Sequence, residues 1–177
     1  MKRISILGST GFIGRHTLEI IREFPERFHL TALSAWYNID LLERQIAEFK
    51  PKVVSVADRD LAVKLKKRLS NNIPRVIYGI EGLKEVAAID EADTAVSAIV
   101  GSSGLIPTLS AIKAGKDVAL ANKESLVMAG QIIMDEVKRR GTNLFPVDSE
   151  HSAIFQALQG HRKEDVKRLV LTASGGP

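Results

Sequence analysis

The feature that most constrains the fold is a glycine-spaced segment at residues 4–14, ISILGSTGFIG. An apolar run ends at Gly8, and Gly11 and Gly14 follow at intervals of three before a helical pattern begins. Gly8 allows a sharp turn, Gly11 lets the backbone approach a phosphate, and Gly14 lets the helix pack closely on the strand. The first helical turn offers free N–H groups and a favourable dipole to a pyrophosphate. The segment predicts a dinucleotide site between a strand and a helix; the alternative is a structural turn without a ligand.

Strand and helix patterns alternate along the rest of the chain. Amphipathic helices separate short apolar segments, which we predict to be strands at residues 28–35, 53–57, 75–78, 94–100, 118–121 and 144–147. Continuously apolar strands are typical of a parallel sheet that helices cover on both faces. The sequence therefore predicts the α/β class: a Rossmann-like, doubly wound, mostly parallel sheet over residues 1–147.

Composition excludes several classes of protein. No apolar run is long enough to span a bilayer, and residues 1–3 lead into a strand instead of a signal-peptide core. The chain has no cysteine, which removes disulfide and thiolate chemistry and suits a cytoplasmic location. Much of the net charge of +4 comes from residues 64–68 on a predicted helix. We interpret that run as a solvated face, so we expect neither a nucleic-acid nor a membrane partner.

The segment after the second predicted strand bears on the choice of dinucleotide. NAD-specific folds place an acid near the end of this strand to bind the ribose hydroxyls. Here the strand ends in Trp36, Tyr37 and Asn38, and the first acid is Asp40. The missing acid favours NADP, although the basic residue expected for a 2′-phosphate is also missing from this turn.

Polar residues follow two later strands. Residues 122–125, Asn-Lys-Glu-Ser, come at the carboxyl end of one strand, where ligands of such sheets bind. Taken alone, Lys123 is explained equally well as a surface residue. Asp148 and Glu150 follow the next strand, and in an extended segment residues i and i+2 point to the same side. Two carboxylates aimed at one point suit Mg²⁺ or Mn²⁺. The alternative is that Asp148 or Ser149 caps the following helix.

The end of the sequence resembles an unfinished element. Residues 167–172 have the pattern of a strand and residues 173–177 that of a turn. An apolar strand at a terminus leaves an edge to be paired, so we expect the polypeptide to continue.

Four motifs together resemble the 1-deoxy-D-xylulose 5-phosphate reductoisomerase family. They are residues 8–14 (GSTGFIG), 121–127 (ANKESLV), 146–151 (PVDSEH) and 171–177 (LTASGGP), in matching order and spacing. The resemblance covers the whole chain. It implies an NADPH-dependent enzyme of isoprenoid biosynthesis that converts a sugar phosphate, 1-deoxy-D-xylulose 5-phosphate, to 2-C-methyl-D-erythritol 4-phosphate. It also implies a homodimer when full length, and a catalytic domain that begins at residues 148–177.

The resemblance also implies roles for single residues. The NADPH site would comprise Gly8, Thr10, Gly11, Phe12, Ile13, Asn38, Asn122 and Glu124, with Phe12 acting through its backbone. Substrate would contact Lys123, Ser149, Glu150 and Ser174, of which Lys123 and Glu150 would be catalytic. Asp148 and Glu150 would bind the divalent metal, Mg²⁺ or Mn²⁺. In the family reaction a carbon skeleton is cleaved and rejoined before hydride transfer to the resulting aldehyde.

Two departures from the family pattern matter. Trp36 and Tyr37 replace the Gly-Lys that commonly precedes Asn38; an aromatic residue there could stack on adenine, and Arg59 could supply the missing charge. Family members are also longer, with a third metal carboxylate, phosphate ligands and a flap beyond residue 177. We therefore expect this chain alone to fold but not to turn over substrate.

Two other classes of protein share the glycine-spaced turn. The extended short-chain dehydrogenases need Tyr-x-x-x-Lys, but Leu41 follows Tyr37 and Gly82 follows Tyr78 at that spacing, which excludes them. An isolated NADP-binding module without catalysis is the remaining alternative.

Overall fold

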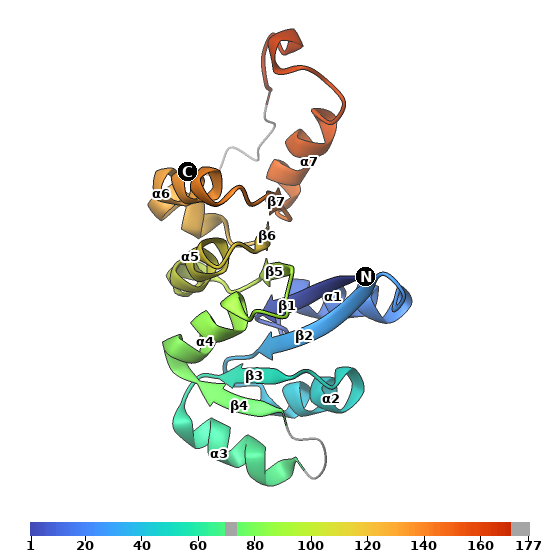
Figure 1. The fold of residues 1–177 in the computed structure, drawn as a ribbon, viewed down its shortest axis with the longest axis vertical. Coiled ribbons are helices and arrows are strands. Elements are labelled where there is room, and N and C mark those ends of the chain that lie inside the picture. The colour runs from blue at the N-terminus through green and yellow to red at the C-terminus, as the bar shows by residue number, and fades with distance from the viewer. Residues whose placement is uncertain (70–73, 171–177) are drawn as a thin grey trace.

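A seven-stranded parallel sheet forms the centre of the protein, in the order β4-β3-β2-β1-β5-β6-β7 (Figure 1). The structure, a computed structural model, describes residues 1–69 and 74–170. The strands are β1 (Lys2–Leu7), β2 (Phe28–Ser34), β3 (Val53–Val56), β4 (Arg75–Tyr78), β5 (Thr94–Ser97), β6 (Asp117–Leu120) and β7 (Leu144–Pro146). The sheet grows outward from β1 in both directions, and β1 pairs in parallel with β2 on one side and β5 on the other. This reversal puts a topological switch point beside the end of β1, where such sheets bind ligands.

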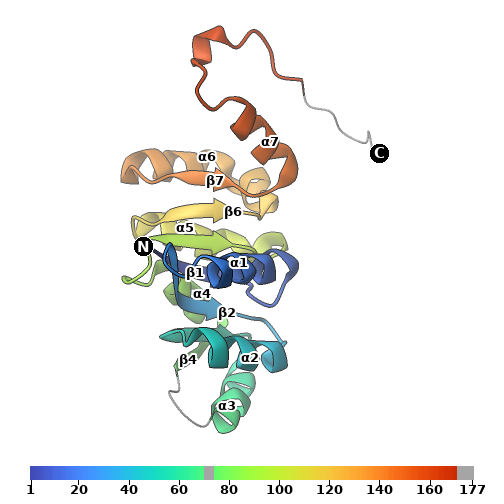
Figure 2. The same ribbon diagram turned by 90° about the vertical axis from the view of Figure 1, so that its right-hand side faces the viewer.

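Helices cover both faces of the sheet. On one face lie α1 (Phe12–Glu23), α2 (Ile39–Phe49) and α3 (Arg59–Arg68), and on the other α4 (Gly79–Ala88), α5 (Leu105–Lys113) and α6 (Lys123–Arg140). Figure 2 shows α1 and α2 in front of the strands. Two separate apolar clusters result, one on each side. Leu42 and Leu65 are fully buried in the first, and Ile112 and Ile133 in the second. Each such side chain contributes roughly 1.5–3 kcal/mol through burial.

The segment after β7 lies outside these layers. The helix α7 (Ser149–Ala157) contributes no buried residue and projects beyond the edge of the sheet (Figures 1 and 2). Two short 3-10 helices complete the elements, η1 (Gly101–Gly104) after β5 and η2 (Lys163–Asp165) after α7. The predicted boundary near residue 147 coincides with this change from buried layers to an exposed helix, and the division into two domains stays a prediction.

The predicted fold class is confirmed: the sheet is doubly wound, and every strand pair in it is parallel. The strand predicted at residues 94–100 ends earlier, at Ser97. The strand predicted at residues 167–172 is wrong for residues 167–170, which have no regular structure, and residues 171 and 172 lie outside the described part. Apolar alternation alone does not make a strand, because its backbone groups need a neighbouring strand to pair with. Over residues 1–69 and 74–170, no helix has the length and apolarity to cross a membrane.

A salt bridge joins β1 to the segment that leads into β5. The Arg3 guanidinium contacts Asp93 Oδ1 at 2.5 Å, and the Arg3 backbone N–H donates to Asp93 Oδ2 at 2.8 Å. The Asp93 N–H in turn donates to the Arg3 carbonyl at 2.8 Å. The Arg3 side chain, and then its backbone N–H, lower the pKa of Asp93 from 3.8 to about 2.

Replacing Asp93 by Asn should therefore destabilise the protein in a pH-dependent way. Because the folded-state pKa is depressed, the stabilisation is present above pH 3.8 and is lost as the pH falls through about 2. We expect Asp93→Asn to cost about 1 kcal/mol at pH 7, a value reduced for solvent screening, and almost nothing at pH 2. Urea unfolding at several pH values measures this. The control Glu26→Gln, on an exposed turn, should match the parent throughout; an equal Asp93→Asn deficit at both pH values would contradict the assignment.

Candidate functional site

The turn after β1 is held by β2 and α2. Gly8 has φ of +85°, and its N–H donates to the Ser34 carbonyl at 3.1 Å and to Ser34 Oγ at 3.0 Å. Behind the turn, the Ser9 hydroxyl donates to Gln45 Oε1 at 2.7 Å, and Gln45 Nε2 donates to the Ser9 carbonyl at 2.9 Å. Both Ser9 and Gln45 are buried. The turn is thus fixed before any ligand binds.

The three glycines of the turn differ in what surrounds them. A Cβ on Gly14 would lie 2.3 Å from the Gly8 carbonyl oxygen, and one on Gly8 would lie 2.8 Å from the Ala98 carbonyl oxygen. The protein's own packing therefore requires glycine at both positions. Close packing was predicted for Gly14, whereas for Gly8 the prediction was a sharp turn, which its positive φ confirms. A Cβ on Gly11 would meet only the Gly8 carbonyl oxygen, at 3.4 Å. Internal packing does not explain Gly11, and the close approach of a phosphate to its backbone stays a prediction.

The helix α1 begins without a side-chain cap. Its N-cap is Gly11, no side chain accepts from its first N–H groups, and its first turn carries no acid. Phe12 and Ile13 are the first two residues of the helix. Phe12 is 67% exposed, and its ring packs on the ring of His16, with centroids 4.2 Å apart. Free N–H groups and the helix dipole make this end a site for an anion.

A cavity of about 310 Å³ opens beside this helix end. Its walls come from the carboxyl ends of β1, β2 and β5 and include no charged residue. The lining residues are Gly8, Thr10, Gly11, Ser34, Ala35, Trp36, Leu83, Ala98, Ile99, Val100 and Ser103. Predicted cofactor residues Gly8, Thr10 and Gly11 are thereby brought together, and an uncharged concave wall suits an aromatic ring or a ribose.

Two of the other predicted cofactor residues have engaged side chains. Asn38 Oδ1 accepts from the Leu41 N–H at 3.1 Å and caps α2. Asn122 is buried, and its Nδ2 donates to the Ile99 carbonyl at 2.6 Å and to the Gly101 carbonyl at 2.8 Å.

The Asn122 Oδ1 accepts from both the N–H and the hydroxyl of Ser125 at the start of α6. Further contacts of Asn122 would have to use its backbone, because its amide has no free hydrogen-bonding group. The next two predicted residues, Lys123 and Glu124, form the first turn of α6.

The extended geometry predicted for residues 148–150 is wrong. Asp148 is the N-cap of α7, its Oδ1 accepts from the His151 N–H at 3.5 Å, and Glu150 lies in the first helical turn. Asp148 therefore does cap the following helix, while its role as a metal ligand stays a prediction. Asp148 and Glu150 lie at the N-cap and in the first turn of α7, two positions apart.

The surroundings of Asp148 favour its charged form. Lys123 Nζ lies 3.5 Å from Asp148 Oδ2, and His151 Nδ1 lies 3.5 Å from Asp148 Oδ1. Burial raises the pKa of Asp148, but the Glu150 side chain, the His151 N–H and the charge of Lys123 outweigh it, so the pKa lies below its usual value. No group of three metal-ligating side chains occurs in the part of the chain that the structure describes. The two carboxylates thus offer a partial ligand set for a hard cation.

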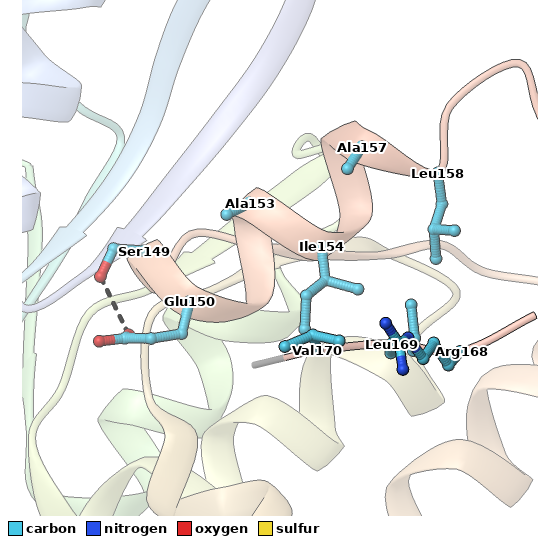
Figure 3. A pocket seen from close by; sticks show the side chains of 9 residues that line it. All are labelled: Ser149, Glu150, Ala153, Ile154, Ala157, Leu158, Arg168, Leu169 and Val170. Atoms are coloured by element: carbon cyan, nitrogen blue, oxygen red, sulfur yellow. Dashed lines mark hydrogen bonds between the residues drawn. The ribbon is translucent and has the colours of Figure 1, made fainter. Parts of the chain in front are cut away.

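A second cavity adjoins these carboxylates. It has a volume of about 490 Å³ and lies between α7 and residues 168–170, with Ser149 and Glu150 at one end (Figure 3). The Ser149 hydroxyl donates to Glu150 Oε2 at 2.9 Å. Predicted substrate residue Ser174 lies outside the described residues. The sequence reasoning missed Arg168 in the wall of this cavity and His151 beside Asp148; the position of His151, three residues after a cap, was the available signal for the latter.

The site residues share one edge of the sheet. They follow β1, β2, β6 and β7, and parallel strands present their carboxyl ends at the same edge. From β1 to β7 there are three strand spacings, which amounts to roughly 14 Å. The nucleotide turn and the carboxylate pair are therefore close enough for one extended ligand, or two adjacent ones, to reach both.

Substituting the two glycines should separate packing from ligand space. Gly14→Ala puts a methyl group against backbone that cannot move aside, and should cost about 2 kcal/mol or more. Gly11→Ala enters nearly open space at an ordinary φ of −77°, and should stay within about 1 kcal/mol of the parent. Urea unfolding compares them. Equal losses at both positions would show that Gly11 is also a packing requirement.

Comparison with known proteins identifies the family. Residues 4–130 match the family model of 1-deoxy-D-xylulose 5-phosphate reductoisomerase, and residues 144–177 match that of its C-terminal domain. The reductoisomerase of Geotalea uraniireducens is 57% identical over 177 residues, which are 100% of this chain and 46% of that protein.

Similar solved structures belong to the same family. The reductoisomerase from Zymomonas mobilis in complex with NADPH is 43% identical with a TM-score of 0.92, over 99% of this chain and 46% of the other. A reductoisomerase in complex with NADPH, fosmidomycin and magnesium is 41% identical with a TM-score of 0.85, over 90% of this chain and 40% of the other. The chain spans about half the length of the relatives it matches. It belongs to the 1-deoxy-D-xylulose 5-phosphate reductoisomerase family.

Proposed function

We propose that this chain forms the NADPH-binding part, and the start of the catalytic part, of an enzyme that converts 1-deoxy-D-xylulose 5-phosphate to 2-C-methyl-D-erythritol 4-phosphate. One observation carries the proposal: the space open at Gly11 lies directly beside the uncapped start of α1. Family membership and the NADPH complex of the Zymomonas mobilis relative support it. A cytoplasmic, homodimeric full-length protein is part of the proposal and rests on the resemblance alone.

The nucleotide turn fits a dinucleotide. The N–H groups at the start of α1, at Phe12 and Ile13, would donate to the pyrophosphate, and Thr10 lines the cavity that continues from it. Asn38 and Asn122 would contribute backbone groups, because the Asn38 side chain caps α2 and the Asn122 side chain bonds to the loop after β5 and to the start of α6. Glu124, in the first turn of α6, would also contact the cofactor. Bound NADPH supplies the hydride, and these residues hold and orient it.

The second half of the site fits a metal and a polar substrate. Asp148 and Glu150 would hold Mg²⁺ or Mn²⁺, which supplies Lewis-acid polarisation of substrate oxygens when bound. Lys123, held 3.5 Å from Asp148, would donate to a substrate oxygen and keep positive charge beside it. Ser149 and Glu150 line the adjoining cavity, where a sugar phosphate would lie. Lys123 and Glu150 are the residues to which we assign catalytic roles, and we retain Ser174 as a substrate residue from the sequence motif.

A second candidate is an NADP-binding module without turnover. It is favoured by one observation: the carboxylate pair has no third acidic side chain beside it within residues 1–69 and 74–170. An assay of NADPH oxidation with 1-deoxy-D-xylulose 5-phosphate and Mg²⁺, run on a sample of verified mass, separates the two candidates. Turnover within tenfold of a full-length relative would exclude the module.

NADPH binding by the chain is the first test of the proposal. Gly11→Val fills the space reserved for the pyrophosphate and should weaken NADPH binding by at least about a hundredfold, since the close backbone approach is lost. Nicotinamide fluorescence during titration measures this. Gly130→Val is the matched control, because a Cβ there also meets open space but lies on α6. Unchanged NADPH affinity in folded Gly11→Val would place the nucleotide elsewhere.

Metal binding is the second test. With two carboxylates, the chain should bind Mn²⁺ weakly, and Asp148→Asn combined with Glu150→Gln should remove that binding. Asn remains a good N-cap, so α7 should persist in the double variant. Calorimetry with Mn²⁺ measures the effect, and Glu164→Gln combined with Asp165→Asn serves as an exposed acidic control pair. Tight Mn²⁺ binding that survives the first double variant would show that the ion binds at another place.

A further inference from the structure

An exposed aromatic pair stands at the end of β2, at the rim of the nucleotide cavity. Trp36 lines that cavity and is 49% exposed, while Tyr37 is 65% exposed. Their rings meet edge to face, with centroids 5.7 Å apart at 73°. The Trp36 carbonyl accepts from the Ala57 N–H at 3.1 Å, so the pairing of β2 with β3 continues to this residue. The backbone at Trp36 is therefore fixed, while about half of the residue's surface stays accessible at the cavity rim.

The charges around this pair are largely engaged. Arg68 contacts Asp40 and Glu43, each at 2.6 Å, so this cation is already neutralised by two carboxylates. Asp58 Oδ1 accepts from the Leu61 N–H at 2.8 Å and caps α3.

Arg59 differs from these residues. It is the first residue of α3, it is exposed, and it forms no ion pair with any residue that the structure describes. It follows Ala57, the partner of Trp36, by two residues, so Arg59 and Trp36 follow the carboxyl ends of neighbouring strands, β3 and β2, at the same edge of the sheet. An Arg near the end of the second strand can accept a 2′-phosphate where the ribose-binding acid is missing.

We propose that Trp36 is the platform on which the adenine ring stacks and that Arg59 selects the 2′-phosphorylated dinucleotide. The inference rests on the proposed function and deepens it by assigning the adenosine end. Base stacking on an aromatic side chain is indifferent to the 2′-phosphate, whereas a guanidinium contact exists only when the phosphate is present. Asp58 and Asp60 flank Arg59 and oppose an anion, so the selection is modest, on the order of tenfold.

The test uses two nucleotides that lack the nicotinamide, adenosine 2′,5′-bisphosphate and adenosine 5′-monophosphate, with affinities measured by calorimetry on the 177-residue chain. Arg59→Gln should weaken binding of the bisphosphate about tenfold and change that of the monophosphate by less than about twofold. Trp36→Leu should weaken both about tenfold and leave their ratio unchanged. Lys67→Gln, which removes an exposed positive charge at the far end of α3, is the control and should leave the ratio as in the parent.

The outcomes separate this inference from the proposed function. A parent chain that binds neither nucleotide overturns the dinucleotide site and this inference with it. A parent that binds both, with a ratio that Arg59→Gln leaves unchanged, keeps the site and overturns the role of Arg59. Unaltered affinities in Trp36→Leu overturn the stacking platform.

Discussion

The close contact between Gly14 and the turn after β1 is the constraint on which the rest of the site depends. No side chain fits between the helix and the Gly8 carbonyl, so α1 starts at the only height above the sheet that this contact permits. Because β1 lies at the middle of the sheet order, that height also sets where the free N–H groups stand relative to β2 and β5. The cavity beside them has no charged wall. The attraction for a phosphate there comes from backbone groups and the helix dipole, not from a lysine or arginine.

The parts of the fold that the sequence predicted are those with local signals. Helical spacing of apolar residues, glycine intervals and capping residues such as Asp58 are readable within a window of a few residues, and the alternation of elements followed from them. The parallel pairing was predicted from the fold class and not from any one residue, and the order of the strands was not predicted.

What could not be predicted depends on contacts between distant segments. The two hydrogen bonds between Ser9 and Gln45 join residues 36 positions apart, and no local sequence pattern in either segment predicts them. The prediction at residues 148–150 failed because strand geometry was extended past the end of β7, whereas the capping tendency of Asp148 ended it. The residues after α7 were assigned to a strand on alternation alone. Whether such a segment forms a strand depends on a pairing partner from a distant part of the chain, which the local pattern does not identify.

The saturated amide of Asn122 has a mechanical consequence. Its side chain bonds at once to the carbonyls of Ile99 and Gly101 and to the start of α6 at Ser125. Releasing either side would leave a buried amide group unpaired, at a cost of roughly 1–3 kcal/mol for each group. The loop after β5, which walls the nucleotide cavity, and the helical turn that carries Lys123 therefore move as one rigid body. Thermal motion can displace that body as a whole, but it cannot easily change the spacing between the cavity wall and the lysine.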